Sequence, residues 1–303
     1  MTMPEYEYND DKPEKLLTGY NTIRGAELKE IYRVLDQPGD VPVSALEDRF
    51  ARPGTNSSSR NTVHVDRCLK FLCAVDMVEV SAQDVVSPMN RDVYPDIKAF
   101  EPRLLHHIRQ QQDEQYHLSY IFDVSVGLDR RRIPEEELLE EVIDDEARSF
   151  GLNWNEDNMR MWANLADPLG AISYLNRGDT NEILVSPTRG LLVDLLSWYQ
   201  ENGEDSDRFA RALEWIDEEF LPMFSTRQGS VPTVAVGVAD VLNNMENEGV
   251  LSLRAMSDTA DVVELPRSDR EGSRNVATYS LEEVPDRPSY WYPLARSERR
   301  VNA

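Results

Sequence analysis

The chain has 303 residues, of which 56 are acidic and 32 are basic, so its formal charge at pH 7 is −24. At about 100–200 residues per domain, this length predicts two or three small domains. No apolar stretch approaches the roughly 18–20 residues that cross a bilayer, the N-terminus is polar and acidic, and two cysteines are too few for a disulfide framework. We therefore expect a cytoplasmic protein that has no contact with a membrane.

Nearly all of the basic residues are arginines, since the sequence holds five lysines and 27 arginines. An excess of carboxylates with so few lysines resembles the proteins of salt-accumulating (halophilic) archaea. In molar salt the Debye length is about 3 Å, so a large net charge repels itself little, and the carboxylates keep the surface hydrated. The acidity would then reflect the surroundings and would not exclude nucleic-acid binding. An ordinary acidic protein is the alternative.

After an acidic arm, residues 1–20, that we expect to be flexible, the segment 21–97 shows a regular pattern. Apolar spacing and turn residues predict three helices and a hairpin, at residues 26–37, 44–50, 61–75 and 77–86. Ser44 and Glu47 have the spacing of a capping box, and Asn61 can cap the third helix. The third helix is amphipathic, with Val65, Cys68, Leu69, Leu72 and Cys73 on its apolar side.

This order of elements is similar to that of a winged helix-turn-helix. The helices at 44–50 and 61–75 and the hairpin at 77–86 resemble the archaeal winged-helix superfamily, which includes transcription regulators and accessory DNA-binding subunits of genome-defence clusters. The resemblance lies in the fold and not in a residue signature. It therefore implies sequence recognition or scaffolding, with a role in transcription regulation or antiviral defence, and it supplies no catalytic residue, metal ligand or cofactor.

The pattern predicts further units along the chain. Residues 98–186 form a helical middle region, which is either a second winged-helix-like unit or a plain helical linker. Residues 187–282 predict a C-terminal winged-helix-like unit, with a hairpin of 250–253 and 261–265 that residues 276–279 can join. Residues 283–303 are expected to form an irregular Arg- and Pro-rich tail. The fold class that we predict is mainly α with small β-hairpins (α+β), built of tandem winged-helix-like units joined by helices.

The best candidate for a DNA-binding surface lies in the first unit. In winged-helix proteins the third helix enters the major groove with its N-terminal half. Asn pairs with adenine and Arg with guanine, whereas arginines and hydroxyls also hold phosphates. The residues that we expect to face DNA are Arg52, Arg60, Asn61, Thr62, His64, Arg67 and Lys70. The alternative is a solvated polar helix face, which Asp66 in its midst supports.

The third helix of the C-terminal unit has the opposite charge. Between Pro232 and Gly249 it carries Asp240, Glu246 and Glu248 and no Arg or Lys, so phosphates would be repelled. We therefore expect this unit to contact protein partners or a second copy of the chain. In the tail, Trp291 and Tyr292 are expected to contact protein as well.

Signals for other chemistry are weak. His64 and Cys68 have an i, i+4 spacing that can share a metal, but Cys68 falls in the apolar stripe, so core packing is the better interpretation. Asp96-Ile97-Lys98 matches the end of a nuclease metal site, yet no upstream acid completes it. We therefore predict a non-enzymatic protein without cofactor or metal, which binds double-stranded DNA as a regulator or as a subunit of a larger assembly. The alternative is a scaffold whose winged helices bind only proteins.

Overall fold

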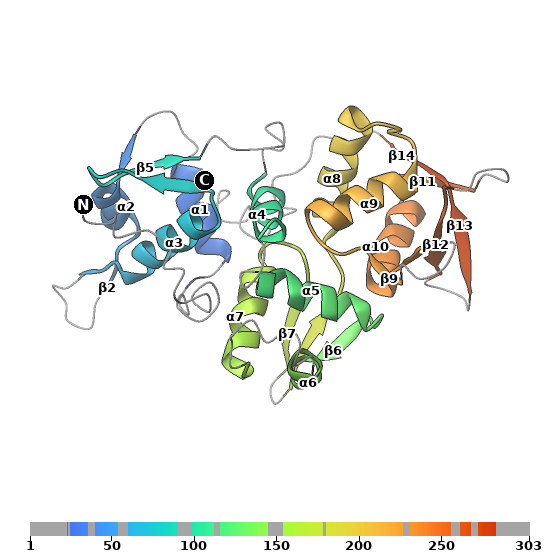
Figure 1. The fold of residues 1–303 in the computed structure, drawn as a ribbon, viewed down its shortest axis with the longest axis horizontal. Coiled ribbons are helices and arrows are strands. Elements are labelled where there is room, and N and C mark those ends of the chain that lie inside the picture. Colours follow the sequence, from blue (N-terminus) through green and yellow to red (C-terminus); the bar gives the residue numbers. More distant parts are fainter. Residues whose placement is uncertain are drawn as a thin grey trace, which may run out of the picture.

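The structure is a computed structural model in which three lobes surround a central helix, α4 (Phe100–Arg109) (Figure 1). The residues that it describes are 23, 25–35, 40–53, 60–89, 99–111, 116–144, 154–177, 180–226, 231–255, 261–267 and 272–282. These residues form helices and short strands in small, mostly antiparallel sheets, which confirms the α+β class. Within the same ranges, no helix has the length and apolar character needed to cross a membrane.

The N-terminal lobe contains three helices, a three-stranded sheet and a separate hairpin. In chain order its elements are α1 (Gly25–Leu35), β1 (Val41–Pro42), α2 (Val43–Phe50), β2 (Arg52–Pro53), β3 (Arg60–Asn61), α3 (Val63–Ala74), β4 (Val78–Val80) and β5 (Val85–Pro88). The sheet has the strand order β1-β5-β4, and β2 pairs with β3 between the second and third helices. The expected hairpin is confirmed, with the Ser81 hydroxyl accepting from the amide of Val85 in its turn (3.2 Å). The expected capping box is wrong, because Ser44 lies inside α2, whose N-cap is Pro42.

The middle lobe repeats this arrangement. Its elements are α5 (His117–Gly127), β6 (Arg132–Pro134), α6 (Glu135–Asp144), α7 (Glu156–Ala166), β7 (Ser173–Arg177) and β8 (Thr180–Leu184). The strand order is β6-β8-β7, so the last strand again lies between the first and the second, as in the N-terminal lobe. The middle region thus contains a three-stranded sheet, which a plain helical linker would lack.

The C-terminal lobe has a different topology. Its elements are α8 (Arg189–Asn202), α9 (Phe209–Glu219), β9 (Phe224–Thr226), β10 (Thr233–Val234), α10 (Val236–Asn247), β11 (Leu251–Arg254), β12 (Val263–Pro266), β13 (Ser273–Val276) and β14 (Thr278–Leu281). The sheets have the orders β13-β12-β10-β9 and β11-β14.

The hairpin expected in this lobe is therefore wrong, because β11 pairs with β14 and not with β12. Tyr279 of β14 is buried, and its hydroxyl donates to the carbonyl oxygen of Leu196 on α8 (3.1 Å). This anchor on α8 holds β14 in the place beside β11.

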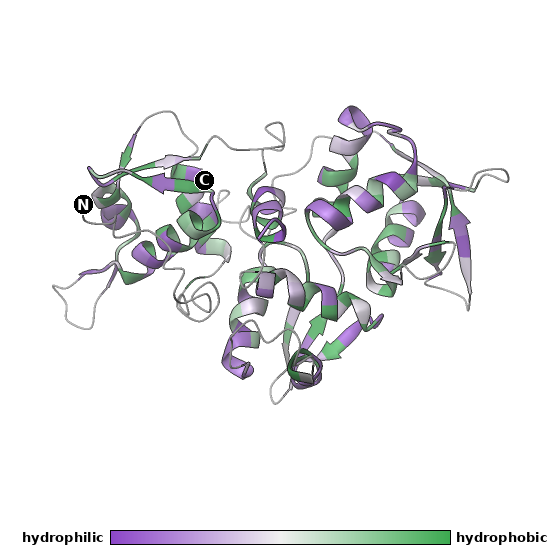
Figure 2. Ribbon diagram, viewed as in Figure 1, coloured by the Kyte–Doolittle hydropathy of each residue, from purple (hydrophilic) through white to green (hydrophobic). Residues whose placement is uncertain are grey.

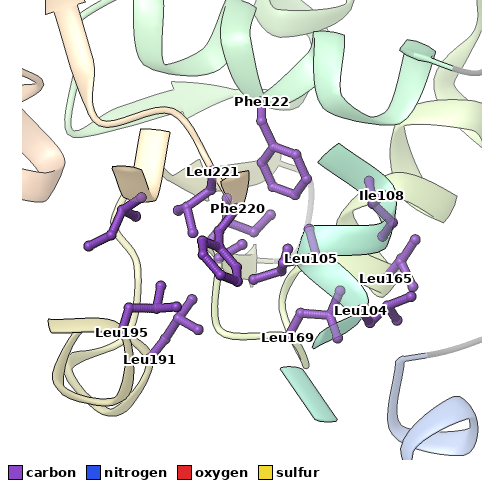
Figure 3. Packing of buried hydrophobic residues seen from close by; sticks show 14 of the residues in the cluster. Leu104, Leu105, Ile108, Phe122, Leu165, Leu169, Leu191, Leu195, Phe220 and Leu221 are labelled. Atoms are coloured by element: carbon purple, nitrogen blue, oxygen red, sulfur yellow. The ribbon is translucent and has the colours of Figure 1, made fainter. Parts of the chain in front are cut away.

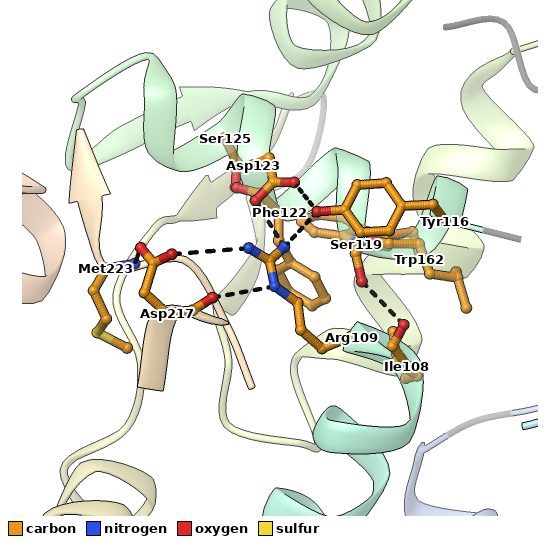
Figure 4. Close-up of polar contacts among 11 residues, drawn as sticks. Ile108, Arg109, Tyr116, Ser119, Phe122, Asp123, Ser125, Trp162, Asp217 and Met223 are labelled. Carbon is orange, nitrogen blue, oxygen red and sulfur yellow. Dashed lines mark hydrogen bonds and ion pairs between the residues drawn. The ribbon is translucent and has the colours of Figure 1, made fainter. Parts of the chain in front are cut away.

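Helix α4 connects the lobes through both its apolar and its polar side chains. Leu104, Leu105 and Ile108 are buried among side chains of the middle and C-terminal lobes (Figure 3). From the end of the same helix, Arg109 donates to Asp123 of α5 (2.8 Å) and to the backbone oxygen of Asp217 of α9 (3.2 Å) (Figure 4). Helices in all three lobes combine hydrophilic and hydrophobic residues along their length, as amphipathic helices do (Figure 2).

Candidate nucleic-acid interface

Helix α3 lies below the β4–β5 hairpin in the view of Figure 1 and contacts α1, α2 and β4. Five apolar residues on its inner side are buried in the lobe: Val65, Cys68, Leu69, Phe71 and Leu72. Cys73, which was expected on the same side, is half-buried. On the other side of the helix, Val63, Arg67 and Lys70 recur at positions i, i+4 and i+7 and keep part of their surface exposed. The expected amphipathic helix is confirmed.

The start of α3 is held by polar side chains that are among the predicted contacts. The Asn61 side-chain oxygen accepts a hydrogen bond from the amide of Val63 (3.1 Å), so Asn61 satisfies one of the unpaired amides of the first turn. The Thr62 hydroxyl donates to Glu47 of α2 (3.3 Å). Asn61 is exposed and Thr62 is half-buried. The N-cap of α3 is Thr62, so the helix begins one residue later than the expected Asn61 cap implies.

Arg52 and Arg60 lie on the small β2–β3 hairpin beside this helix end. Each forms an ion pair within the lobe: Arg52 with Glu27 of α1, and Arg60 with Asp48 of α2 (2.5 Å). Exposed pairs of this kind contribute only about 0–1 kcal/mol to stability. The two guanidinium groups therefore lose little if they exchange a carboxylate for another anion.

Arg67 and Lys70 are half-buried. Lys70 forms an ion pair with Asp66, four residues earlier on the same helix (3.1 Å). The surface formed by α3 and the β2–β3 hairpin thus carries both charges. A carboxylate lies next to each of Arg52, Arg60 and Lys70.

His64 is a correction to the predicted set of DNA-facing residues. It is only 6% exposed, and its Nε2 donates to the carbonyl oxygen of Phe50 at the end of α2 (2.8 Å). Its pKa is lowered, first by burial and then by the charge of Arg52. The physical reason is its position: His64 lies one turn before Cys68 and so borders the apolar side of α3, where α2 covers it. The neutral imidazole fastens α3 to α2 and does not face solvent.

The structure also shows how the two residues with metal-ligand spacing, His64 and Cys68, are used. In the described parts of the chain, no three His, Cys, Asp or Glu residues are grouped so that they could hold a metal ion. Burial raises the pKa of both the Cys68 and the Cys73 thiols to about 12, so both are protonated at neutral pH. For Cys68, which is fully buried, the core-packing interpretation is confirmed.

Some predicted residues lie outside the described ranges. These are Asp96, Trp291 and Tyr292. The expected protein contact of Trp291 and Tyr292 stays a prediction, and the weak nuclease-like match at Asp96 stays untested.

One exposed residue of this face did not figure among the sequence-based candidates. Val63, the first residue of α3, is 52% exposed. The signal was present in the sequence, because Val63 lies four residues before Arg67 and seven before Lys70 and therefore shares their side of the helix.

The carboxylates of α10, the acidic helix of the C-terminal lobe, form ion pairs with arginines of the same chain. Asp240 accepts from Arg131 of the middle lobe (3.1 Å), Glu246 accepts from Arg274 of β13 (3.2 Å), and Glu248 pairs with Arg189. The helix also begins no earlier than Val236, because Pro232 precedes the short strand β10. The acidic residues that were expected to meet a partner are thus largely engaged by arginines of the same chain.

Comparison with known proteins identifies no relative, since no family model, no curated protein and no solved structure matches the chain. Inferences about function therefore rest on the chain's own residues and their arrangement.

Proposed function

We propose that this protein binds double-stranded DNA through its N-terminal lobe, without catalysing a reaction, as a regulator or as a subunit of a larger DNA-acting assembly. The observation that carries the proposal is the outer face of α3, where Arg67 and Lys70 are partly exposed on one side of the helix and Asn61 lies exposed just before its first turn. The proposal is also supported by the lobe that presents this helix, in which a strand follows the first helix, a hairpin follows the third, and the sheet has the order β1-β5-β4.

The residues have the chemistry that reading a duplex requires. A recognition helix contacts base edges with its N-terminal residues, and this end of α3 carries Asn61. An Asn side chain pairs with adenine and Arg pairs with the O6 and N7 of guanine, which suits Asn61 and Arg67. Arg52 and Arg60, on the neighbouring hairpin, suit phosphates, since contacts to the backbone set the position of a protein on DNA.

Salt limits how much affinity such a surface can draw from charge. Affinity for DNA falls by about 0.9 log units per contacted phosphate for each tenfold rise in salt concentration, so six contacts would lose on the order of seven decades between 0.15 M and 3 M salt. A chain adapted to molar salt therefore has to rely on base contacts and shape. A small face with paired arginines is consistent with that requirement.

The test is a DNA-binding titration with the full-length chain in high KCl, using a pool of random duplexes and then the selected sequence. We expect the double variant Arg67→Glu with Lys70→Glu to lose sequence-dependent binding. The matched control is Arg132→Glu with Arg254→Glu, which makes the same change in net charge at exposed positions of the other two lobes. If the α3 variant and the control bind equally well, α3 does not contact DNA.

A scaffold that binds only proteins is the second candidate, and the middle lobe favours it. That lobe repeats the topology of the first, but the exposed side of its equivalent helix, α7, carries Glu156, Asp157, Arg160 and Asn164. Its first turn would repel phosphates, so this lobe suits a protein partner better than DNA. If the wild-type chain selects no duplex at any salt concentration, the scaffold interpretation replaces the first.

A further inference from the structure

The polar outer face of α3 begins with an apolar side chain that the core does not use. Val63 is 52% exposed, and Ile143 of α6 (46%) is the other large apolar residue of the described chain that is exposed to this extent. Both residues lie on helices, but only Val63 shares its face with arginine and lysine side chains.

Helix stability does not explain a valine at this position. A β-branched residue has a lower helix propensity than alanine, and one that keeps half of its surface exposed gains little packing energy in return. Single exposed apolar residues are common on protein surfaces, so exposure alone indicates nothing. Here the exposed residue is the first of the helix, one turn before Arg67, in the part of a recognition helix that approaches base edges. Local preferences that are broken without a structural gain are expected at functional positions.

The major groove offers one apolar group for such a side chain, the 5-methyl group of thymine. We propose that Val63 contacts the methyl group of a thymine and so determines base specificity at one position of the bound sequence. This inference rests on the proposed DNA binding. The neighbouring Asn61 suits an adenine, so the helix end would favour a site rich in A·T pairs.

The test uses the full-length protein and the duplex that it selects from a random pool. Each thymine of that duplex is replaced in turn by deoxyuridine, which removes the methyl group and leaves every hydrogen-bonding group unchanged. For the wild type we expect one position at which the replacement weakens binding about fourfold, the effect of losing one buried methyl group. For Val63→Ala we expect no difference between thymine and deoxyuridine at that position. Ile143→Ala is the control and should behave as the wild type.

The outcomes separate this inference from the proposed function. If binding depends on Arg67 and Lys70 but no thymine is sensitive, or if Val63→Ala keeps the full sensitivity, the role of Val63 is overturned and DNA binding stands. If the wild type binds no duplex, or if Arg67→Glu with Lys70→Glu binds as the wild type does, the DNA-binding face and the role of Val63 both fail.

Discussion

Lys29 of α1 and Glu101 of α4 form a 2.5 Å ion pair in which the carboxylate is only 2% exposed. The pair joins the N-terminal lobe to the central helix, next to the tilted ring contact of Tyr32 with Phe100 (5.4 Å between ring centres, 41° between ring planes). Because a buried charge needs a partner, the pair makes the attachment of the lobe sensitive to both residues.

Removal of the cation should therefore destabilise the protein. Lys29→Met leaves the buried carboxylate unpaired, and we expect the free energy of unfolding to fall by about 3–5 kcal/mol at neutral pH. Lys70→Met, which breaks a more exposed pair on α3, should cost about 0–1 kcal/mol. Urea unfolding at constant salt, followed by circular dichroism, measures both values. Equal effects of the two substitutions would show that Glu101 has no need of Lys29.

The same variant has a defined pH dependence. Burial raises the pKa of Glu101, while the charge and the hydrogen bond of Lys29 lower it, so loss of Lys29 raises this pKa further. A group with a raised pKa in the folded state favours folding when it is protonated, and this contribution is lost as pH rises through the folded-state pKa. The deficit of Lys29→Met should thus be small in acid and grow toward neutral pH. A deficit that is constant with pH would contradict the assignment.

A close approach between backbones fixes the C-terminal lobe on the middle lobe. A Cβ atom on Gly237, at the start of α10, would lie 1.7 Å from the carbonyl oxygen of Val185, which follows β8. Gly237→Ala should therefore displace α10 and cost about 1–3 kcal/mol or more of unfolding free energy. The control is Gly127→Ala at the end of α5, where nothing lies within 4 Å of the added atom. There we expect no loss, and the thermal unfolding temperatures of the two variants should differ accordingly.

The ion pair between Arg60 and Asp48 predicts a gain in DNA affinity on removal of the carboxylate. If Asp48 competes with phosphate for Arg60, Asp48→Asn should tighten binding by up to about fivefold. In an Arg60→Ala background the same substitution should have a smaller effect, because the competition has gone. The control Asp157→Asn, at an exposed position of α7, should change little. An equal gain in both backgrounds would indicate general charge repulsion and no direct competition.

The buried position of His64 predicts its titration. Its pKa is lowered from the ordinary value of 6.5 by burial and by Arg52, so the neutral ring is the folded form. A His with a lowered pKa favours folding above its unfolded pKa, and this contribution is lost as pH falls through the folded-state pKa. NMR of the imidazole should show titration below 6.5 in the folded chain and near 6.5 in urea. A pKa above 6.5 in the folded state would contradict the buried contact with Phe50.

Much of the N-terminal lobe could be predicted from its sequence. The helix Val63–Ala74 and the hairpin of Val78–Val80 with Val85–Pro88 follow from local signals, namely the period of apolar residues and a turn between the strands. The same signals identified six of the seven candidate contacts as surface positions. They erred at His64, which lies at the border of the apolar stripe. Whether such a residue is buried or exposed depends on which element packs against it, here the end of α2.

Local patterns report which side of an element is buried, but they do not name its partner. The pairing of β1 with β5 depends on a strand of two residues that carries no pattern of its own. Strand β14 pairs with β11, and its Tyr279 contacts α8, which is distant in the sequence. Likewise, the arginines of the candidate site are visible in the sequence, whereas Glu27 and Asp48 become their partners only when α1 and α2 pack beside the β2–β3 hairpin. The amino-acid sequence by itself thus determines the helices, the acidity of the chain, and which side of α3 is apolar and which is polar. Contacts between distant segments decide the strand order and the charge balance of that face, because both depend on atoms brought together by packing.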